Sequence, residues 1–516
     1  MSRSCTRFER VQSLLASAAL CLCGVAVAAQ PAADDLRAIN RLTYGVNDAA
    51  VDGYGSVGRS GFWAQQLQFV GDVSLPQTAR AAVDAMMISR VPTRDIVGAY
   101  EEEARGLKEM AEGEARKSKH KALNERYRFV TEEAQRRHLI RALYSRNQLQ
   151  EQLTWFWFNH FNVFQGKDKV RLLVADYEEH AIRPHVFGRF RDLLLATIMH
   201  PAMLLYLDNA QNAAGRINEN YARELLELHT LGVDGGYTQQ DVQELARILT
   251  GVGVSLDAKP IPLPPRLRGY YVAQGMFAFN PHRHDFGEKT FLHHRITGRG
   301  FDEVAEVADI LCAEPATAHF ISSKLAVYFM GDAPPANVVQ RMQDSFLASG
   351  GNIAHTLRAL FDSSEFWRDE YLGKKFKDPV QYVLSALRLA YDGRVITNYK
   401  PALNWLHALG EPLYGRQTPD GYGLRQKDWA SSEQMTTRFE IARQFSNASG
   451  RLFDTPEAVG LEAAHTGDPQ TDIDRPRVFA RWQVLLSPQT VQALSLARDT
   501  REWTALFLSA PEFMYR

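Results

Sequence analysis

The segment NENYARELLELHTLGVDGGYTQQDVQELARILTG, Asn218–Gly251, carries the clearest structural signal in the chain. Apolar residues recur at helical spacing on both sides of a double-glycine turn, which predicts two helices that fold back on each other. Glu224 and Glu227 are three residues apart on the first helix and so face the same way. Asp241 and Glu244 repeat this spacing on the second helix. Acids crowded in this way repel one another unless a cation, a proton or a basic side chain lies among them, so we expect the chemistry of the chain here.

Helical patterns also fill most of the chain on either side of this segment. The run WFWFNHF at 155–161 places aromatic side chains all round a helix, so some of them must be buried. Residues 252–300 interrupt the helical pattern, and alternating apolar residues at 277–279 and around Phe291 predict a β-hairpin there. We expect a mainly α fold, a large multi-helix assembly with a small β-hairpin insertion, as a single large helical domain over 30–516.

Two segments of this domain differ from the rest in composition. Residues 101–138 are heavily charged and contain no proline, which favours a long exposed helix or a helical arm. Acids are interspersed among the basic residues of this segment, and the whole chain has a net charge of −1, so nucleic acid is not an expected partner. Residues 408–434 are rich in glycine and proline and have the length of a functional loop.

The first 29 residues have the features of a secretory signal peptide. Arg3, Arg7 and Arg10 precede an apolar run, and the small residues at 26–28 offer a cleavage site. The apolar run is nearly long enough to span a membrane, which leaves a transmembrane anchor as the alternative. The small residues favour cleavage. We therefore expect a signal peptide at 1–29, a periplasmic or secreted mature protein, and no transmembrane anchor after cleavage.

Three interpretations of the acidic helices remain open. Arg223 and Arg247 could neutralise the acids in a buried salt-bridge network. Glu224 and Glu227 could instead form a catalytic acid/base pair without a metal, or could bind a divalent metal. His229 lies well round the helix from both acids, so a metal would need ligands from another element. The candidates for those ligands are His160, His284 and Asp285. Oxygen and imidazole ligands together suit zinc, manganese or iron.

The residues outside the acidic helices have alternative roles of their own. His160 lies on an apolar helical face, where a hydrogen-bonded core histidine is favoured over a ligand. His284 and Asp285 lie at the tip of the expected hairpin, where they could form the turn or act as a base held by its neighbour. Aromatic residues of the 408–434 loop are candidates for stacking on a ligand. The candidate substrate-binding residues are Asn220, Arg223, Tyr422 and Trp429.

Several motifs together resemble one bacterial family, the domain of unknown function 1800. The matching pieces are WFWFNHF at 155–161, HPAMLLYLDNAQN at 200–212, the segment Asn218–Gly251, FNPHRHDFGEKTFL at 279–292, FKDPVQYVLSALR at 376–388 and LSAPEFMYR at 508–516. The resemblance implies an exported, mostly helical protein of unassigned activity. It also implies an exported partner of the domain of unknown function 1501 type, a family that looks related to alkaline phosphatases and sulfatases and is often encoded alongside. Family members usually carry a glycine-tryptophan pair in the late loop, where this chain has PDGYG followed by Trp429.

Our leading functional hypothesis is a hydrolase that acts on an envelope or extracellular polymer. Glu224 and Glu227 would act as acid and base or as metal ligands, with His284 and Asp285 closing the site, because two carboxylates in different environments can divide these roles. The alternative is a non-catalytic helical binding partner or scaffold for a neighbouring exported enzyme, with 101–138 as the interaction arm. The chain has no nucleophile elbow, P-loop, H-E-x-x-H or paired C-x-x-C motif.

Overall fold

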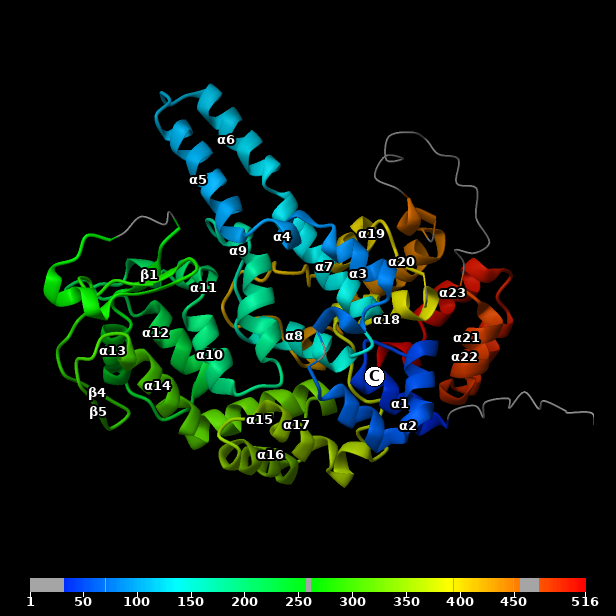
Figure 1. Ribbon diagram of the computed structural model, residues 1–516. Helices are drawn as coiled ribbons and strands as arrows, with labels where there is room; N and C mark the ends of the chain where they lie inside the picture. The colour runs from blue at the N-terminus through cyan, green and yellow to red at the C-terminus, as the bar shows by residue number, and fades with distance from the viewer. Residues whose placement is uncertain (1–31, 70, 257–260, 393, 449, 455–472) are drawn as a thin grey trace, which may run out of the picture.

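The computed structural model describes residues 32–69, 71–256, 261–392, 394–448, 450–454 and 473–516. The expected signal peptide at 1–29 lies outside the described residues. Within these ranges helices dominate, and five short strands lie together on the left of Figure 1. The expected mainly α fold with a small β insertion is confirmed. No described helix is both long and apolar enough to cross a membrane.

The helix α8, Gln148–His160, runs through the core, and every one of its residues is buried. Its aromatic side chains pack in several directions, as a helix ringed by aromatic groups requires. The rings of Trp155 and Phe158 stack with centroids 5.8 Å apart, and Phe156 contacts Tyr328 at 5.1 Å. The helices that precede and follow α8 are α1 Ala33–Leu42, α2 Asp48–Gln66, α3 Gln77–Asp84, α4 Met87–Arg90, α7 Phe129–Tyr144, α9 Val170–Asp176, α10 Phe190–Ile198 and α11 Pro201–Tyr206.

A pair of helices, α5 and α6, projects from the body of the molecule (Figure 1). α5 covers Thr93–Lys108 and α6 covers Glu114–Arg126. The charged segment 101–138 is therefore not one exposed helix, because it contains the turn of this hairpin and the start of α7. α7 lies in the core, since apolar residues such as Val130 and Leu139 give it a buried face.

The insertion contains two small sheets. β1 Val252–Val254, β2 Val272–Gln274 and β3 Phe277–Phe279 form an antiparallel sheet in the order β1-β3-β2. β4 Lys289–Phe291 pairs with β5 His294–Ile296. The prediction of a hairpin formed by 277–279 and 289–291 is wrong. Both edges of β3 are already occupied by β1 and β2, so β4 has no free edge to pair with.

The second half of the chain returns to helices. α15 and α17 pack on α16, and α14 packs on α10. These helices and the later ones are α14 Asp302–Ala313, α15 Pro315–Met330, α16 Ala336–Ala348, α17 Ile353–Phe361, α18 Pro379–Ala390, α19 Lys400–Ala408, α20 Ser432–Ala448, α21 Arg475–Trp482, α22 Pro488–Ser495 and α23 Thr500–Leu508.

The glycine- and proline-rich loop 408–434 is fastened to the end of α8. The Asn159 side chain donates to the carbonyl of Tyr422 at 2.9 Å and accepts from its N–H at 2.6 Å. Asn162 donates to the carbonyls of Arg416 and Thr418. Both asparagines thereby replace the sheet or helix partners that this loop backbone lacks, and they fix residues 416–422 over the core.

Candidate functional site

The expected acidic helices form, and Glu224 and Glu227 lie on the first of them. α12, Asn220–Glu224, continues directly into the π-helical turn η5, Leu225–Thr230, and α13, Gln239–Ile248, follows the glycine turn. Hydrogen bonds in a π turn reach five residues along the chain, one more than in an α turn, and such turns occur frequently at functional sites. Glu227 thus lies within the irregular turn, and Glu224 is the last residue of α12 directly before it.

The acids of α13 have structural roles. Asp241 forms a capping box with Thr238 at the start of the helix and accepts a bond from the N–H of Leu292, which ties α13 to the β4–β5 hairpin. Glu244 forms an ion pair with Arg247, with 2.8 Å between Oε2 and Nη1. The salt-bridge interpretation therefore describes α13.

Glu224 and Glu227 are in a different situation, because neither forms an ion pair among the described residues. Arg223 instead donates to Glu219 at 3.2 Å and to Gln239 at 2.9 Å. The half-buried Glu224 has no hydrogen bond or ion pair in the described part of the chain. Burial, followed by the negative charge of Glu227, raises the pKa of Glu224.

A third carboxylate, Asp420, comes from the late loop. Its negative charge also contributes to the raised pKa of Glu224. Arg416 donates to both oxygens of Asp420, at 3.0 and 2.9 Å, and Thr418 donates to one of them. Burial alone would raise the pKa of Asp420, but these bonds outweigh it and lower the pKa. Two neighbouring carboxyl groups are therefore perturbed in opposite directions.

Lys324 of α15 supplies a cation to the same cluster. Its Nζ donates to His160 Nδ1 at 3.0 Å, and His160 Nε2 donates to the carbonyl of His229 at 3.0 Å. These two bonds assign a neutral His160 with its proton on Nε2. Burial lowers the pKa of Lys324 to about 8, against the opposing effect of the Asp420 carboxylate. Burial and the Lys324 charge also hold the pKa of His160 well below its usual value.

Both ring nitrogens of His160 are engaged in this arrangement, so neither lone pair is left for a metal. Among the described residues, no three or more histidine, cysteine, aspartate and glutamate side chains are grouped so that they could hold a metal ion. Burial lowers the pKa of the neighbouring His229 to about 3, with a smaller contribution from Lys324. His160 and His229 are therefore neutral parts of the core beneath the acids.

His284 lies in a separate buried cluster of the insertion. It was expected at an exposed hairpin tip, but only 5% of it is exposed. Its Nε2 donates to Glu303 at 2.9 Å, and Lys289 Nζ binds the other oxygen of Glu303 at 2.6 Å. Its Nδ1 lies 2.8 Å from the carbonyl of Thr250. His284 thereby holds the insertion against the end of α13 and the start of α14.

Asp285 belongs to the ion-pair network of α13. Its carboxylate accepts from Arg247 Nε at 2.8 Å and from the N–H of Gly287 at 2.8 Å. No described hydrogen bond, ion pair or ring contact joins His284 or Asp285 to Glu224 or Glu227. The structure therefore does not bring this pair into the acidic site as the sequence led us to expect. Arg247 recruits Asp285 because its guanidinium can bind Glu244 and Asp285 together.

The candidate substrate-binding residues divide in the same way. Asn220 and Arg223 lie on α12 beside Glu224, and Asn220 is exposed with its side-chain amide on the carbonyl of Leu207. Tyr422 and Trp429 are 8% and 7% exposed, which leaves little ring surface for a ligand. The Tyr422 hydroxyl donates to the carbonyl of Pro412, and the Trp429 ring N–H donates to that of Gly423. Their rings secure the loop itself, which corrects the stacking role expected for them.

Sequence reasoning missed Lys324 and Asp420. The signal for Lys324 is a single lysine in the otherwise apolar run KLAVYFM at 324–330, since a charge at a core-facing position is rare without a partner. Asp420 lies in PDGYG, within the loop already singled out, but its proximity to Glu224 depends on how Asn159 and Asn162 anchor that loop.

Comparison with known families matches the chain over nearly its whole length. The family model described as "Protein of unknown function (DUF1800)" matches residues 37–515. No curated protein and no solved structure shows a significant match.

Proposed function

The chain belongs to the DUF1800 family of proteins of unknown function, and we propose that it is a hydrolase acting on an envelope or extracellular polymer. One observation carries the proposal. The unpaired, half-buried Glu224 has a raised pKa beside Asp420, whose pKa is lowered. Enzymes that use a general acid and a general base commonly have two neighbouring titratable groups, one with a raised pKa and one with a lowered pKa.

The chemistry assigns each group one step. Protonated Glu224 transfers its proton to the leaving-group oxygen of the scissile bond. Ionised Asp420 removes a proton from the attacking water, whose oxygen forms the new bond. The reaction consumes one water molecule in total. Glu224 then regains a proton from solvent and Asp420 releases one, which restores the starting state. Two carboxyl groups in these roles are found in glycoside hydrolases, which favours a polysaccharide as the polymer.

Glu227 and Lys324 act through their charge in this scheme. Negative Glu227 keeps Glu224 protonated at higher pH, because two adjacent carboxylates resist double ionisation. Lys324, hydrogen-bonded to His160, stabilises negative charge on Asp420 or on the reacting group. His284 and Asp285 have no part in the scheme, since they stabilise the insertion.

The test is a screen of the purified protein against envelope and extracellular polysaccharides, with release of new chain ends as the readout. Glu224→Gln keeps the shape and removes the proton, so we expect it to lower the rate by about 100-fold or more. The matched control is Glu314→Gln, because Glu314 is also half-buried and its side chain has no ion pair among the described residues. A polysaccharide cleaved equally by wild type and Glu224→Gln contradicts the proposal.

We also propose that the protein is exported to the periplasm or secreted, by means of the signal peptide at 1–29. Expression of the full chain with N-terminal sequencing of the mature product tests this. A new N-terminus close to residue 30 in the exported fraction supports it, and an intact Met1 in the cytoplasmic fraction contradicts it.

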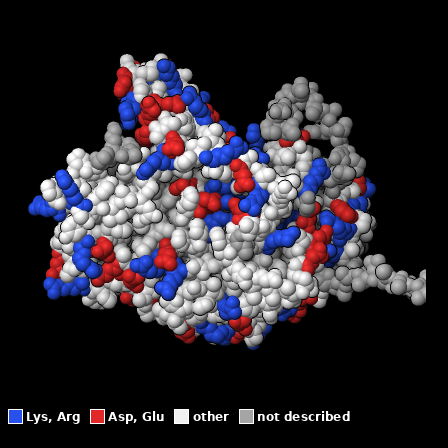
Figure 2. Space-filling model, in the orientation of Figure 1, with Lys and Arg blue, Asp and Glu red and all other residues white. Residues whose placement is uncertain are grey.

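The projecting α5–α6 hairpin favours a second candidate function, a binding partner or scaffold for an exported enzyme of the domain of unknown function 1501 type. The hairpin extends away from the core, and Figure 2 shows both Lys/Arg and Asp/Glu side chains over it on the visible face. Mixed charges of this kind favour a protein surface over nucleic acid.

This second function has its own test, which is binding between the protein and a purified neighbour of that type. Lys119 and Lys121 are exposed on α6. We expect the double change Lys119→Glu and Lys121→Glu to weaken binding about tenfold or more, while Lys400→Glu on α19 has no effect. Equal binding by all three proteins excludes the hairpin as the docking surface.

A further inference from the structure

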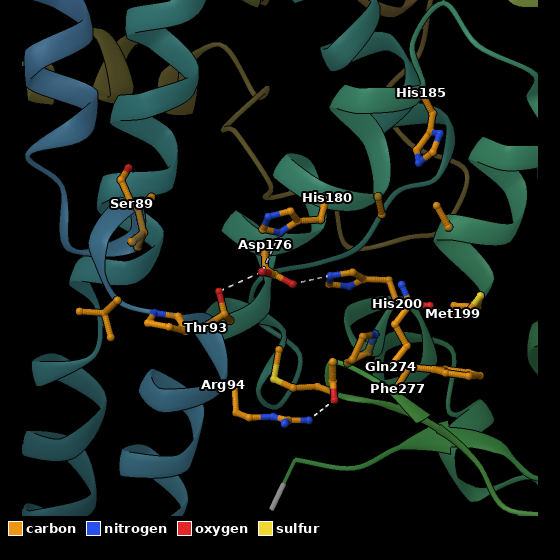
Figure 3. A pocket seen from close by; sticks show the side chains of 18 of the residues that line it. Ser89, Thr93, Arg94, Asp176, His180, His185, Met199, His200, Gln274 and Phe277 are labelled. Atoms are coloured by element: carbon orange, nitrogen blue, oxygen red, sulfur yellow. Dashed lines mark hydrogen bonds and ion pairs between the residues drawn. The ribbon is translucent and has the colours of Figure 1, made fainter. Parts of the chain in front are cut away.

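A cavity of about 740 Å³ lies at the base of the α5–α6 hairpin. Its walls come from α4 and the start of α5, from the π-helical turn η2, Tyr177–Ile182, from the start of α11, and from the turn between β2 and β3 (Figure 3). A volume of this size accommodates a small organic ligand. Glu224, Glu227, Asp420 and Lys324 are not among its lining residues, so it is distinct from the acidic site.

Asp176, at the end of α9, is the one acidic side chain in the described cavity wall. One of its oxygens accepts from Thr93 Oγ1 at 3.0 Å and from His180 Nδ1 at 2.9 Å, and the other accepts from His200 Nε2 at 3.0 Å (Figure 3). Burial would raise the pKa of Asp176, but the two histidine bonds outweigh it and hold the pKa far below its usual range. Both oxygens of the single carboxylate in the described wall therefore already accept hydrogen bonds from protein groups.

The two histidines bound to Asp176 differ in what they can still do. His200 Nδ1 accepts the N–H of Ala202 at the start of α11, so His200 stays neutral with its proton on Nε2. Among the described residues only Nδ1 of His180 has a hydrogen-bond partner, and the side chain is 70% exposed. His180 can therefore carry a full positive charge and present its Nε2–H to a ligand.

Two arginines add positive charge to the same cavity. Arg94 donates to the carbonyl of Gly275, and Arg90 donates to the carbonyls of Asp84 and Ala85. Neither arginine forms an ion pair with a described carboxylate. The wall thus carries Arg90, Arg94 and ionisable His180 against the single carboxylate of Asp176, which is an excess of positive charge.

Ser89, His185 and Gln274 add polar groups, and much of the remaining wall is apolar. It includes Ile88, Val91, Ala196, Met199, Met276 and Phe277. Methionine side chains adapt their shape to a ligand, and the ring of Phe277 offers a flat apolar contact. A ligand that matches this wall has an apolar body and an anionic group.

We propose that this cavity binds an amphipathic organic anion, with its carboxylate, phosphate or sulfonate group between Arg94 and His180 and its apolar body against Met199 and Phe277. The arginine supplies several N–H donors to the anionic group, and His180 supplies one more when it is protonated. The proposal is independent of the hydrolase activity, because none of the proposed catalytic residues contributes to the cavity.

The experiment uses two fluorescent probes of similar shape and different charge. 8-Anilinonaphthalene-1-sulfonate carries a sulfonate, and N-phenyl-1-naphthylamine is its uncharged analogue. We expect Arg94→Gln to weaken binding of the sulfonate about tenfold and to leave binding of the neutral probe unchanged. The control is Arg105→Gln, an exposed arginine further along α5, which should alter neither. Ala196→Phe should fill the cavity and remove binding of both probes.

The pH dependence gives a second readout on the same proteins. The hydrogen bond to Asp176 raises the pKa of His180, burial opposes this, the charges of Asp176 and Glu179 add to the rise, and Arg137 opposes it. Binding of the sulfonate should therefore weaken as the pH rises through the raised pKa of His180, and His180→Gln should abolish that dependence. Three results overturn the proposal: no binding of the sulfonate by wild type, equal affinity in wild type and Arg94→Gln, or full binding by a folded Ala196→Phe variant.

Discussion

Lys324 Nζ lies 3.0 Å from His160 Nδ1, a contact that joins residues 164 positions apart in the chain. It places an amine of lowered pKa at the end of α8 and beneath the loop that carries Asp420. Burial disfavours the charged form of the amine, so the folded protein is less stable relative to the unfolded chain while this lysine is protonated. The contact therefore has consequences for stability as well as for the proposed chemistry.

The first prediction concerns the replacement of this lysine by an apolar group of similar length. Lys324→Met should stabilise the protein at pH 7 by about 2 kcal/mol, because the folded-state pKa of about 8 is below the ordinary 10.5. The unfolded chain binds more protons between these two values, so the stability of the wild type should rise with pH across that window and the advantage of the variant should shrink.

Urea denaturation at a series of pH values measures this effect. The control is Lys374→Met, because Lys374 is exposed; its stability should follow the wild type at every pH. A Lys324→Met variant that is less stable than the wild type at pH 7 would show that burial of the charged lysine does not destabilise the folded protein.

The second prediction concerns the coupling between Glu224 and Glu227. The proposed acid must be protonated, so hydrolysis should slow as the pH rises through the raised pKa of Glu224. Glu227→Gln removes a negative charge that contributes to this raised pKa. The descending limb of the pH–rate profile should therefore move to lower pH in Glu227→Gln. A limb that stays in place would mean that Glu224 is not the group titrating in that limb.

The third prediction concerns the buried cluster of His284, Lys289 and Glu303. Glu303 and Lys289 have fully buried side chains, so Glu303→Gln should leave Lys289 as an unpaired buried charge and destabilise the protein by about 3 kcal/mol. The nearby Glu306→Gln breaks only a partly exposed pair with Arg299 and should cost less than about 1 kcal/mol. Denaturation midpoints at pH 7 measure both changes.

The same cluster should respond to acid. Burial would raise the pKa of Glu303, but its bonds with His284 and Lys289 outweigh burial and lower the pKa below 4.5. Its contribution to stability is therefore fully present above pH 4.5 and is lost as the pH falls through the lowered value. Equal acid sensitivity in wild type and Glu303→Gln would contradict this assignment.

The features that the sequence predicted correctly depend on nearby residues. The two acidic helices and the burial of aromatic residues in the Trp155–Phe158 run both follow from spacing within a few residues. Hydrophobic periodicity and capping preferences act over this range.

The features that the sequence did not predict depend on distant residues. The sequence predicts His284 and Asp285 at the tip of a hairpin. In the structure His284 binds Glu303 and Asp285 binds Arg247, in clusters that the local pattern does not predict. Asp420, whose charge adds to the raised pKa of Glu224, and the Lys324–His160 pair come from elements far along the chain. The wall of the cavity around Asp176 likewise comes from four separate segments of chain, within 88–94, 176–185, 196–201 and 274–277. Local patterns contain no information on such convergence.

The most direct test of general acid catalysis by Glu224 compares a poor leaving group with a good one. A polysaccharide substrate found by the screen and its activated dinitrophenyl derivative would be hydrolysed by wild type and by Glu224→Gln. We predict a loss of about 100-fold on the natural linkage, whose leaving oxygen needs a proton, and a loss of about tenfold or less on the derivative, whose leaving group departs as an anion. An equal loss on both substrates, or no loss on the natural one, would contradict the central claim.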